Sequence, residues 1–144
     1  MIDFGPLIDG FGTALTAYHL ALMAGGVLLG ILVGVLPGLG APDGVALLLP
    51  LTFGMEPIAG IIVLSSMYWG ALFGGSTTSI LFNIPGEPSS VATTFDGYPL
   101  AQQGRAAEAL ATAFMSAAFG ALAGGVGVTL LAHSVPADAL RFSA

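Results

Sequence analysis

Residues 14–36 contain no formal charge when His19 is taken as neutral. A helix of about 20 apolar residues spans the hydrocarbon core of a bilayer, so this run is long enough to cross with some tilt. Two further apolar runs cover residues 57–75, continuing in a broken, more polar form to 84, and about 106–132. We therefore predict an all-α integral membrane protein with about three full transmembrane helices.

The composition agrees with a membrane location. Only 7% of the 144 residues are charged, whereas soluble domains carry roughly 25%. Lysine is absent and the formal net charge is −6, which argues against nucleic-acid binding and against a polybasic membrane-surface anchor. The lipid bilayer is the partner that this composition predicts.

Proline and glycine interrupt the apolar pattern after the first run. The stretch Pro37-Gly-Leu-Gly-Ala-Pro-Asp-Gly44 predicts a loop or hinge. The apolar segment Val45–Phe53 that follows is too short to span and contains Pro50. It fits a half-helix, a re-entrant arm or the kinked start of a longer helix. The expected fold is a single membrane domain over residues 1–144, with one or two broken or re-entrant segments besides the full spans.

Glycines recur every four residues in the predicted spans. Small residues at this spacing let two helix backbones approach closely in lipid. We therefore interpret them as packing residues, and we expect partners beyond this chain to receive so many small faces. The glycines with this predicted packing role are Gly26, Gly30, Gly34, Gly70, Gly120 and Gly124, with Gly38 extending the first series.

The stretch Trp69–Gly86 begins apolar and then becomes polar and broken. Four consecutive hydroxyl residues follow Gly74 and Gly75: Ser76, Thr77, Thr78 and Ser79. They cannot share one helix face, because successive residues turn by about 100°. In one interpretation the segment unwinds, and its free amides and hydroxyls bind an anion or a small cation. In the other, the hydroxyls bond to the preceding turn and only bend the helix.

The sequence Asn83-Ile-Pro-Gly86 ends this stretch, either as the end of a re-entrant arm or as an ordinary helix cap. Enzyme motifs are lacking: there is no phosphate-binding loop, no His-Glu-x-x-His zinc motif and no serine-hydrolase elbow, and there are no cysteines. We therefore expect neither an enzyme nor an ATPase module in this chain, and no cofactor.

Four segments in this order and spacing resemble the large membrane subunit of tripartite tricarboxylate transporters, the TctA type. They are Val33–Gly40, Leu47–Thr52, Tyr68–Gly86 and Asp96–Ala101. The resemblance implies a multi-pass permease of the bacterial inner membrane, a secondary transporter of tricarboxylates or related carboxylates coupled to Na⁺ or H⁺. It also implies two partners, a small membrane subunit and a periplasmic binding protein.

The resemblance places the substrate or ion site on two broken segments. Pro37, Gly38 and Gly40 would form one loop, and Gly74, Gly75, Ser76, Thr77, Thr78, Ser79, Asn83, Pro85 and Gly86 the other. Members of the family are several times longer, so the chain corresponds to the N-terminal part of the first half of such a permease. The alternative is a small helical membrane scaffold or assembly partner without transport activity of its own.

Overall fold

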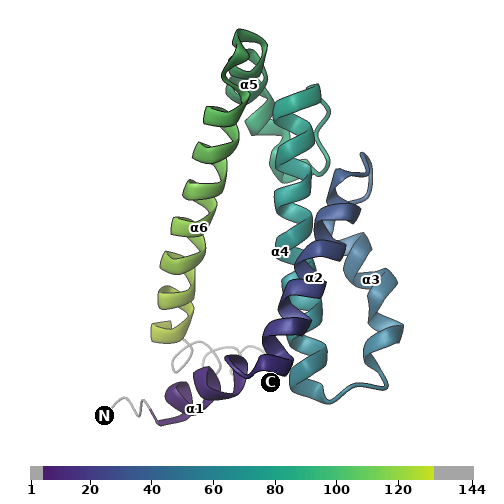
Figure 1. Ribbon diagram of the computed structural model, residues 1–144, viewed down its shortest axis with the longest axis vertical. Coiled ribbons are helices and arrows are strands. Elements are labelled where there is room, and N and C mark those ends of the chain that lie inside the picture. Colours follow the sequence, from purple (N-terminus) through teal and green to yellow (C-terminus); the bar gives the residue numbers. More distant parts are fainter. Residues whose placement is uncertain (1–4, 132–144) are drawn as a thin grey trace, which may run out of the picture.

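The computed structural model describes residues 5–131, and each element in that range is helical (Figure 1). The helices are α1 (Gly5–Ala14), α2 (Ala17–Val35), α3 (Ala41–Thr52), α4 (Pro57–Phe82), α5 (Val91–Leu100) and α6 (Ala106–Leu131). A 3₁₀ turn, η1 (Pro88–Ser90), precedes α5, and a π-helical turn, η2 (Ala101–Arg105), joins α5 to α6. Three helical stretches are long and apolar enough to cross a membrane: Ala17–Val35, Pro57–Phe82 and Pro88–Thr129. The predicted all-α fold is confirmed.

The ends of the spans follow from local signals. Helix α2 begins three residues later than predicted because the Thr16 hydroxyl caps it, accepting a hydrogen bond from His19 N–H at 3.4 Å. Pro37 follows its C-terminal end, as expected where proline disfavours the helical conformation of the preceding residue. Residue 132, the predicted end of the third span, lies outside the described residues.

Helices α2 and α4 pack backbone against backbone. A Cβ atom added to Gly30 would overlap the carbonyl oxygen of Met67, and one added to Gly34 would overlap that of Ala71. From the opposite side, a Cβ on Gly74 would lie 2.5 Å from the carbonyl oxygen of Ile31. We call this contact the α2–α4 seam, defined by Gly26, Gly30 and Gly34 of α2 and Gly70 and Gly74 of α4.

The seam lies within one chain, so its glycines need no partner subunit. We expected the glycines of α2 to pack on other subunits, but α4 of the same chain packs against all three of them. The glycine series on α2 also ends at Gly34, one position earlier than its spacing predicts. Gly38 lies beyond α2 in the following turn, with φ +89°, a conformation that favours glycine.

Helix α3 lies against α4 and is too short to cross a membrane (Figure 1). Ala41, Met67 and Ala71 form a small buried core between the two helices. Pro50 lies in the last turn of α3. The short apolar segment is thus a helix that begins four residues before the predicted Val45, because Gly40 and Pro42 start it.

Helix α6 forms an arm that runs apart from α2 and α4 along most of its length (Figure 1). In the most apolar part of α4, 44% of the residues are buried, whereas in the most apolar part of the stretch Pro88–Thr129 only 6% are buried. An edge-to-face pair, Phe73 and Phe114, links α4 to α6 with ring centroids 5.2 Å apart. Gly120 and Gly124 have open space where a side chain would start, so their packing role stays a prediction.

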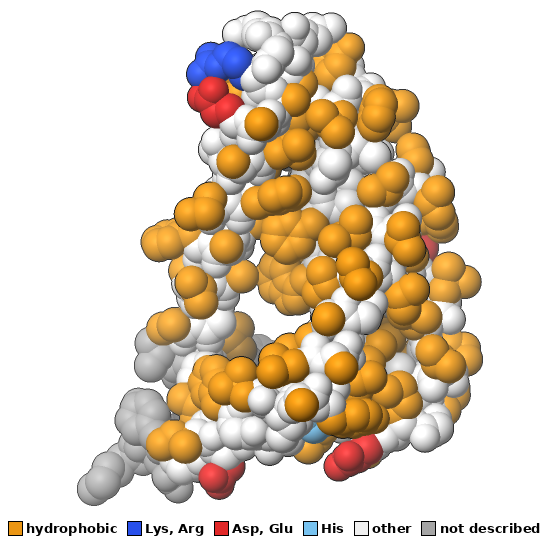
Figure 2. All heavy atoms as spheres, in the orientation of Figure 1, with side chains coloured by type: hydrophobic (Ala, Val, Ile, Leu, Met, Phe, Trp, Pro, Cys, Tyr) orange, Lys and Arg blue, Asp and Glu red, His pale blue; other side chains and the backbone are white. Residues whose placement is uncertain are grey.

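Hydrophobic side chains cover most of the visible surface, and the charged side chains gather mostly towards the two ends (Figure 2). The same view shows a hollow between the α6 arm and the rest of the bundle. Leu28, Leu32 and Phe119 are among the large apolar side chains that stay exposed. Such a surface suits a hydrocarbon environment, because a water-soluble domain rarely exposes so continuous an apolar area.

Candidate functional site

The hydroxyl run Ser76–Ser79 lies on an unbroken part of α4. Each hydroxyl donates to a carbonyl of the preceding turn: Ser76 to Leu72 (3.0 Å), Thr77 to Phe73 (2.9 Å), Thr78 to Gly75 (3.0 Å) and Ser79 to Gly75 (2.8 Å). The predicted break within this run is therefore wrong, and the back-bonding interpretation holds. The hydroxyl protons are accepted by carbonyl groups of the helix itself, and α4 continues through the run to Phe82.

The break comes at Asn83, one residue after α4 ends. Asn83 is exposed and left-handed, with φ 57° and ψ 28°, and it forms the C-cap of α4. Asparagine adopts this conformation more readily than most residues with a side chain. The geometry is that of the ordinary cap, one of the two alternatives that the sequence left open.

We expect the backbone conformation, rather than the amide group, to determine the effect of substitutions at Asn83. Asn83→Gly should leave the free energy of unfolding unchanged or slightly raised, since glycine adopts positive φ without strain. Asn83→Val should lower it by about 1–2 kcal/mol. Unfolding of the purified protein in detergent measures both. An equal loss in the two variants would contradict this explanation and would point to the amide group.

The loop after Asn83 folds back onto α4 through glycine. A Cβ on Gly86 would lie 2.5 Å from the Cα of Gly75, 2.6 Å from the carbonyl oxygen of Gly34 and 3.1 Å from the Thr78 hydroxyl oxygen. Helix α2, helix α4 and the loop therefore meet at Gly86, where the two closest neighbours of an added Cβ are backbone atoms. We call this contact the Gly86 junction, made by Gly34, Gly75, Thr78 and Gly86.

The predicted site residues differ in burial and fall into three groups. Gly40, Gly74, Gly75, Thr78, Ser79 and Gly86 are buried. Pro37, Gly38, Asn83 and Pro85 are exposed, while Ser76 and Thr77 are half-buried. The residues predicted to form one polar site thus divide into packing residues and residues on the outside of the loops.

A buried hydrogen-bond network joins α4 to η1. Ser79, fully buried, donates to the Ser90 hydroxyl oxygen (2.9 Å) and shares its one proton between that oxygen and the carbonyl of Gly75. The Ser90 hydroxyl donates to the carbonyl oxygen of Glu87 (2.8 Å) and accepts from Glu87 N–H (3.3 Å). Ser79 is therefore occupied in holding the loop and is not free for a ligand.

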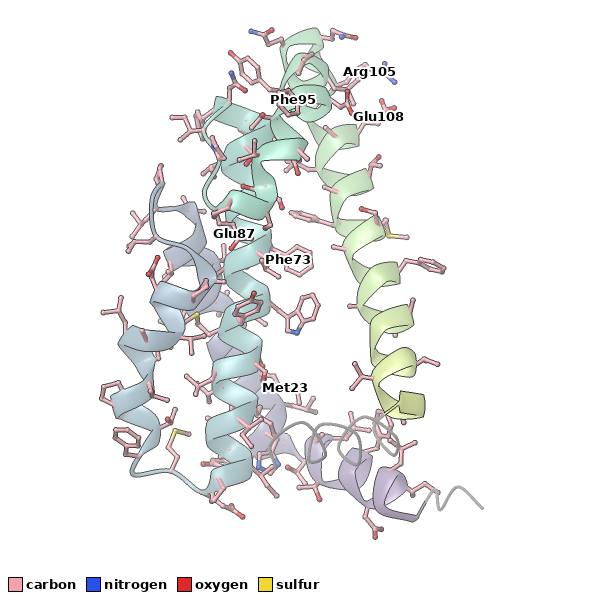
Figure 3. All side chains as sticks on the ribbon, turned by 180° about the vertical axis from the view of Figure 1, so that it is seen from behind. Met23, Phe73, Glu87, Phe95, Arg105 and Glu108 are labelled. Atoms are coloured by element: carbon pink, nitrogen blue, oxygen red, sulfur yellow. The ribbon has the colours of Figure 1, made fainter. Side chains whose placement is uncertain are left out.

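Glu87 is a residue that the sequence reasoning missed. Its side chain is 8% exposed, and Figure 3 shows it beside α4 on the side of α3. Its carboxylate accepts hydrogen bonds from Ala41 N–H at the start of α3 (3.3 Å) and from the Ser89 hydroxyl. The signal in the sequence is a lone acidic residue between Gly86 and Pro88, immediately after the helix break.

The amides at the start of α3 are already bound. Gly40 N–H donates to the carboxylate of Asp43 (3.0 Å), and Ala41 N–H donates to Glu87. Helix N-termini attract anions because their first amides lack partners within the helix. Here two carboxylates of the chain itself occupy that position, so these two amides are not free for a substrate.

A cavity of about 470 Å³ lies between α4, α5 and α6. Its polar lining consists of four hydroxyl groups and one carboxylate, from Ser76, Thr93, Thr112, Ser116 and Asp96. The rest of its lining is Ile80, Gly97, Leu100, Ala109, Ala113 and Ala117. None of these described lining residues is basic. Of the hydroxyl run on α4, only Ser76 reaches this cavity.

Three of the four hydroxyl groups of the cavity donate to carbonyl groups of their own helices. Ser76 donates to Leu72, Thr112 to the carbonyl of Glu108 (2.8 Å) and Ser116 to that of Ala113 (2.9 Å). Arg105 forms two exposed hydrogen bonds with the carboxylate of Glu108, 2.6 and 2.8 Å long. Both residues lie near the start of α6, at the top of Figure 3. With three of its four hydroxyl protons committed and the carboxylate of Asp96 in its lining, the cavity offers mainly acceptors, which suit a cation better than an anion.

The arrangement of spans, loops and glycines can be compared with known proteins. The sequence matches the tripartite tricarboxylate transporter TctA family over residues 20–144. The chain belongs to this family. A relative from Agrobacterium vitis, described as an uncharacterized 52.8 kDa protein in the TAR-I ttuC' 3'region, is 51% identical over 138 residues. No solved structure matches.

The TctA-family chain covers only part of that relative. The alignment includes 94% of this chain but 27% of the relative's length. The family match begins within α2 and takes in the seam, α3, the Gly86 junction and the cavity. With three stretches able to cross a membrane, the chain has the architecture of a multi-pass membrane protein of this family.

Proposed function

We propose that this chain is part of a permease subunit that carries tricarboxylates or related carboxylates across the bacterial inner membrane, coupled to a cation. A periplasmic binding protein would deliver the substrate, and a small membrane subunit would accompany the permease. The TctA family supports this direction, since it is a family of tripartite transporters. On this proposal the chain is a transporter segment rather than an enzyme.

The observation that carries the coupling is the cavity between α4, α5 and α6. Asp96 and the oxygens of Ser76, Thr112 and Ser116 line it, and no basic side chain among the described lining residues competes for the carboxylate. Ionisable residues within membrane proteins commonly serve ion pathways. We propose that Asp96 and these oxygens hold the coupling cation, with Na⁺ as the ion to be tested first.

A bound cation would also help to recruit an anionic substrate. Two unit charges 4 Å apart interact by about 4 kcal/mol at an effective dielectric constant of 20. Asp96 alone would repel a carboxylate by an amount of that order at such a distance, and a cation beside it would cancel the repulsion. Substrate affinity would then depend on the ion, as coupled transport requires.

Substitutions in the cavity should change the dependence of uptake on sodium. In a full-length permease carrying this segment, we expect Asp96→Asn to raise the sodium concentration for half-maximal carboxylate uptake by about tenfold or more, because a charged ligand is lost. Ser76→Ala should raise it by a smaller factor. Uptake into membrane vesicles at varied NaCl, with choline chloride replacing the salt, measures both effects.

Matched controls come from the same chain. Asp9→Asn removes an exposed carboxylate of α1, and Ser65→Ala removes an exposed hydroxyl of α4 itself. Neither residue lines the cavity, so both variants should keep the sodium dependence of the unmodified permease. An unchanged dependence in Asp96→Asn, with normal amounts of protein in the membrane, would exclude the cavity as the coupling site.

A further inference from the structure

Glu87 connects two segments that are distant in sequence. Its carboxylate, in the loop after α4, accepts a hydrogen bond from the backbone of Ala41, which lies 46 residues earlier at the start of α3. The second carboxylate oxygen accepts from the Ser89 hydroxyl in the next turn of the chain. Hydrogen bonds to an ionised acceptor are roughly twice as strong as neutral ones.

The Glu87 end of this connection is fixed to α4. The Ser90 hydroxyl accepts from Glu87 N–H and donates to the Glu87 carbonyl oxygen. The Ser79 hydroxyl of α4 in turn donates to the Ser90 hydroxyl. One residue before Glu87, the Gly86 junction presses the same loop onto Gly75. The carboxylate is therefore attached to a rigid support, and its position is set by α4.

The Ala41 end has few other polar attachments. The loop of residues 36–40 before it includes exposed Pro37 and Gly38, and its internal hydrogen bond joins Leu39 N–H to the carbonyl of Leu36 (3.0 Å). Asp43 binds Gly40 N–H, but this contact lies within α3 and its cap. Among the described hydrogen bonds of residues 39–43, only the one from Ala41 N–H to Glu87 reaches beyond this loop and α3.

We propose that Glu87 is a positioning residue, which holds the loop of residues 36–40 and the first turn of α3 against the end of α4. The buried core of Ala41, Met67 and Ala71 also packs the start of α3 on α4, so loss of the Glu87 carboxylate releases the loop without unfolding the bundle. The effect of this release on transport rests on the proposed function, whereas the release itself does not.

Thiol labelling tests the release directly, because the sequence contains no cysteine. Leu39→Cys places a reporter at a half-buried position in the loop, and Ala59→Cys places one at a fully buried position of α4. Each reporter is combined with Glu87→Ala, Glu87→Gln or Glu56→Ala in the full chain, purified in detergent. The rate of maleimide labelling is then compared with that of the reporter alone.

We expect Glu87→Ala to speed labelling of Leu39→Cys by about tenfold or more, since a charge-assisted hydrogen bond is lost. Glu87→Gln should have a smaller effect, because its side-chain carbonyl still accepts from Ala41 N–H. Glu56→Ala removes an exposed carboxylate and should leave the rate unchanged. Ala59→Cys should stay protected throughout.

Two results would overturn the proposal. If Glu87→Ala leaves the labelling of Leu39→Cys unchanged, the carboxylate does not hold the loop. If Ala59→Cys becomes reactive to the same extent, Glu87 supports the whole bundle and has no local positioning role. Uptake separates this proposal from the coupling site: normal sodium dependence in Asp96→Asn would reject the cavity, while faster labelling in Glu87→Ala would still support the positioning role.

Discussion

Replacing Gly30 by alanine should lower the stability of the protein strongly, as should the same change at Gly34, whereas Gly25 of the same helix can be replaced at little cost. The new Cβ would overlap the carbonyl oxygen of Met67, the amide nitrogen of Ala71 at 2.8 Å and the Cα of Gly70 at 2.9 Å. All three are backbone atoms and cannot rotate away, so the helices must separate. Overpacking of this kind costs typically 1–3 kcal/mol, occasionally more, and separation would also loosen the contacts on either side along the seam.

Gly25→Ala is the matched control, because Gly25 neighbours the seam glycine Gly26 on the same helix and has nothing within 4 Å of an added Cβ. Alanine at that position should leave stability unchanged or slightly raised, since glycine in a helix interior is less favourable than alanine by roughly 0.5–1 kcal/mol. Unfolding midpoints in detergent, read by circular dichroism, measure both variants. Equal midpoints for Gly30→Ala and Gly25→Ala would show that the α2–α4 seam is looser than described.

Gly86→Ala should have the largest effect among the loop residues, on both folding and uptake. Its Cβ would lie 2.5 Å from the Cα of Gly75 and 2.6 Å from the carbonyl oxygen of Gly34. The loop would have to move away from α4, which would break the hydrogen bond between Ser79 and Ser90 and displace Glu87. We expect a loss of about 1–3 kcal/mol in stability and a large loss of uptake in a full-length permease carrying the change.

Alanine substitutions at two other glycines should cause smaller losses of stability and uptake than Gly86→Ala. A Cβ on Gly75 would meet the Cγ of Glu87 at 3.2 Å, a side-chain atom that can shift, so Gly75→Ala should cost less than Gly86→Ala. Gly54, in the turn between α3 and α4, has open space, and Gly54→Ala should be neutral. The order Gly86, Gly75, Gly54 in thermal unfolding and in uptake checks the geometry. Any other order would contradict it.

Local spacing was enough to predict the spans and their close packing. The uncharged run of residues 14–36 and the four-residue spacing of Gly26, Gly30 and Gly34 indicate a membrane helix with a small face. The same spacing of Gly70 and Gly74 predicted a second small face, which lies on α4 and packs against α2. These predictions succeed because helix period and residue size act over a few residues, and both can be read from the chain itself.

The hydroxyl run could not be interpreted uniquely from its sequence. Ser76–Ser79 satisfies the backbone equally well in two ways, by unwinding towards a ligand or by donating to the preceding turn. The structure has the second arrangement. To choose between the two arrangements, one must know which residues surround each hydroxyl, and these come from segments distant in sequence. Ser90 lies beside Ser79, and Thr112 lines the same cavity as Ser76.

Glu87 was missed for a related reason. Its partner Ala41 is 46 residues away, and an alanine carries no side-chain signal that its amide needs an acceptor. A buried acidic residue is expected to have a partner, but the sequence does not say that Glu87 is buried. Only the packing of the loop through Gly86 places the carboxylate at the first turn of α3.

The α2–α4 seam limits how this chain can change shape. Side chains that interdigitate can exchange rotamers and let two helices slide, whereas the backbones of α2 and α4 touch directly at Gly30 and Gly34. Sliding would move the carbonyl oxygens of Met67 and Ala71 away from these glycines and onto neighbouring side chains of α2, so we expect the two helices to turn as a single body. Movement between alternative conformations is then left to the contacts made by side chains, at α3 and along the α6 arm.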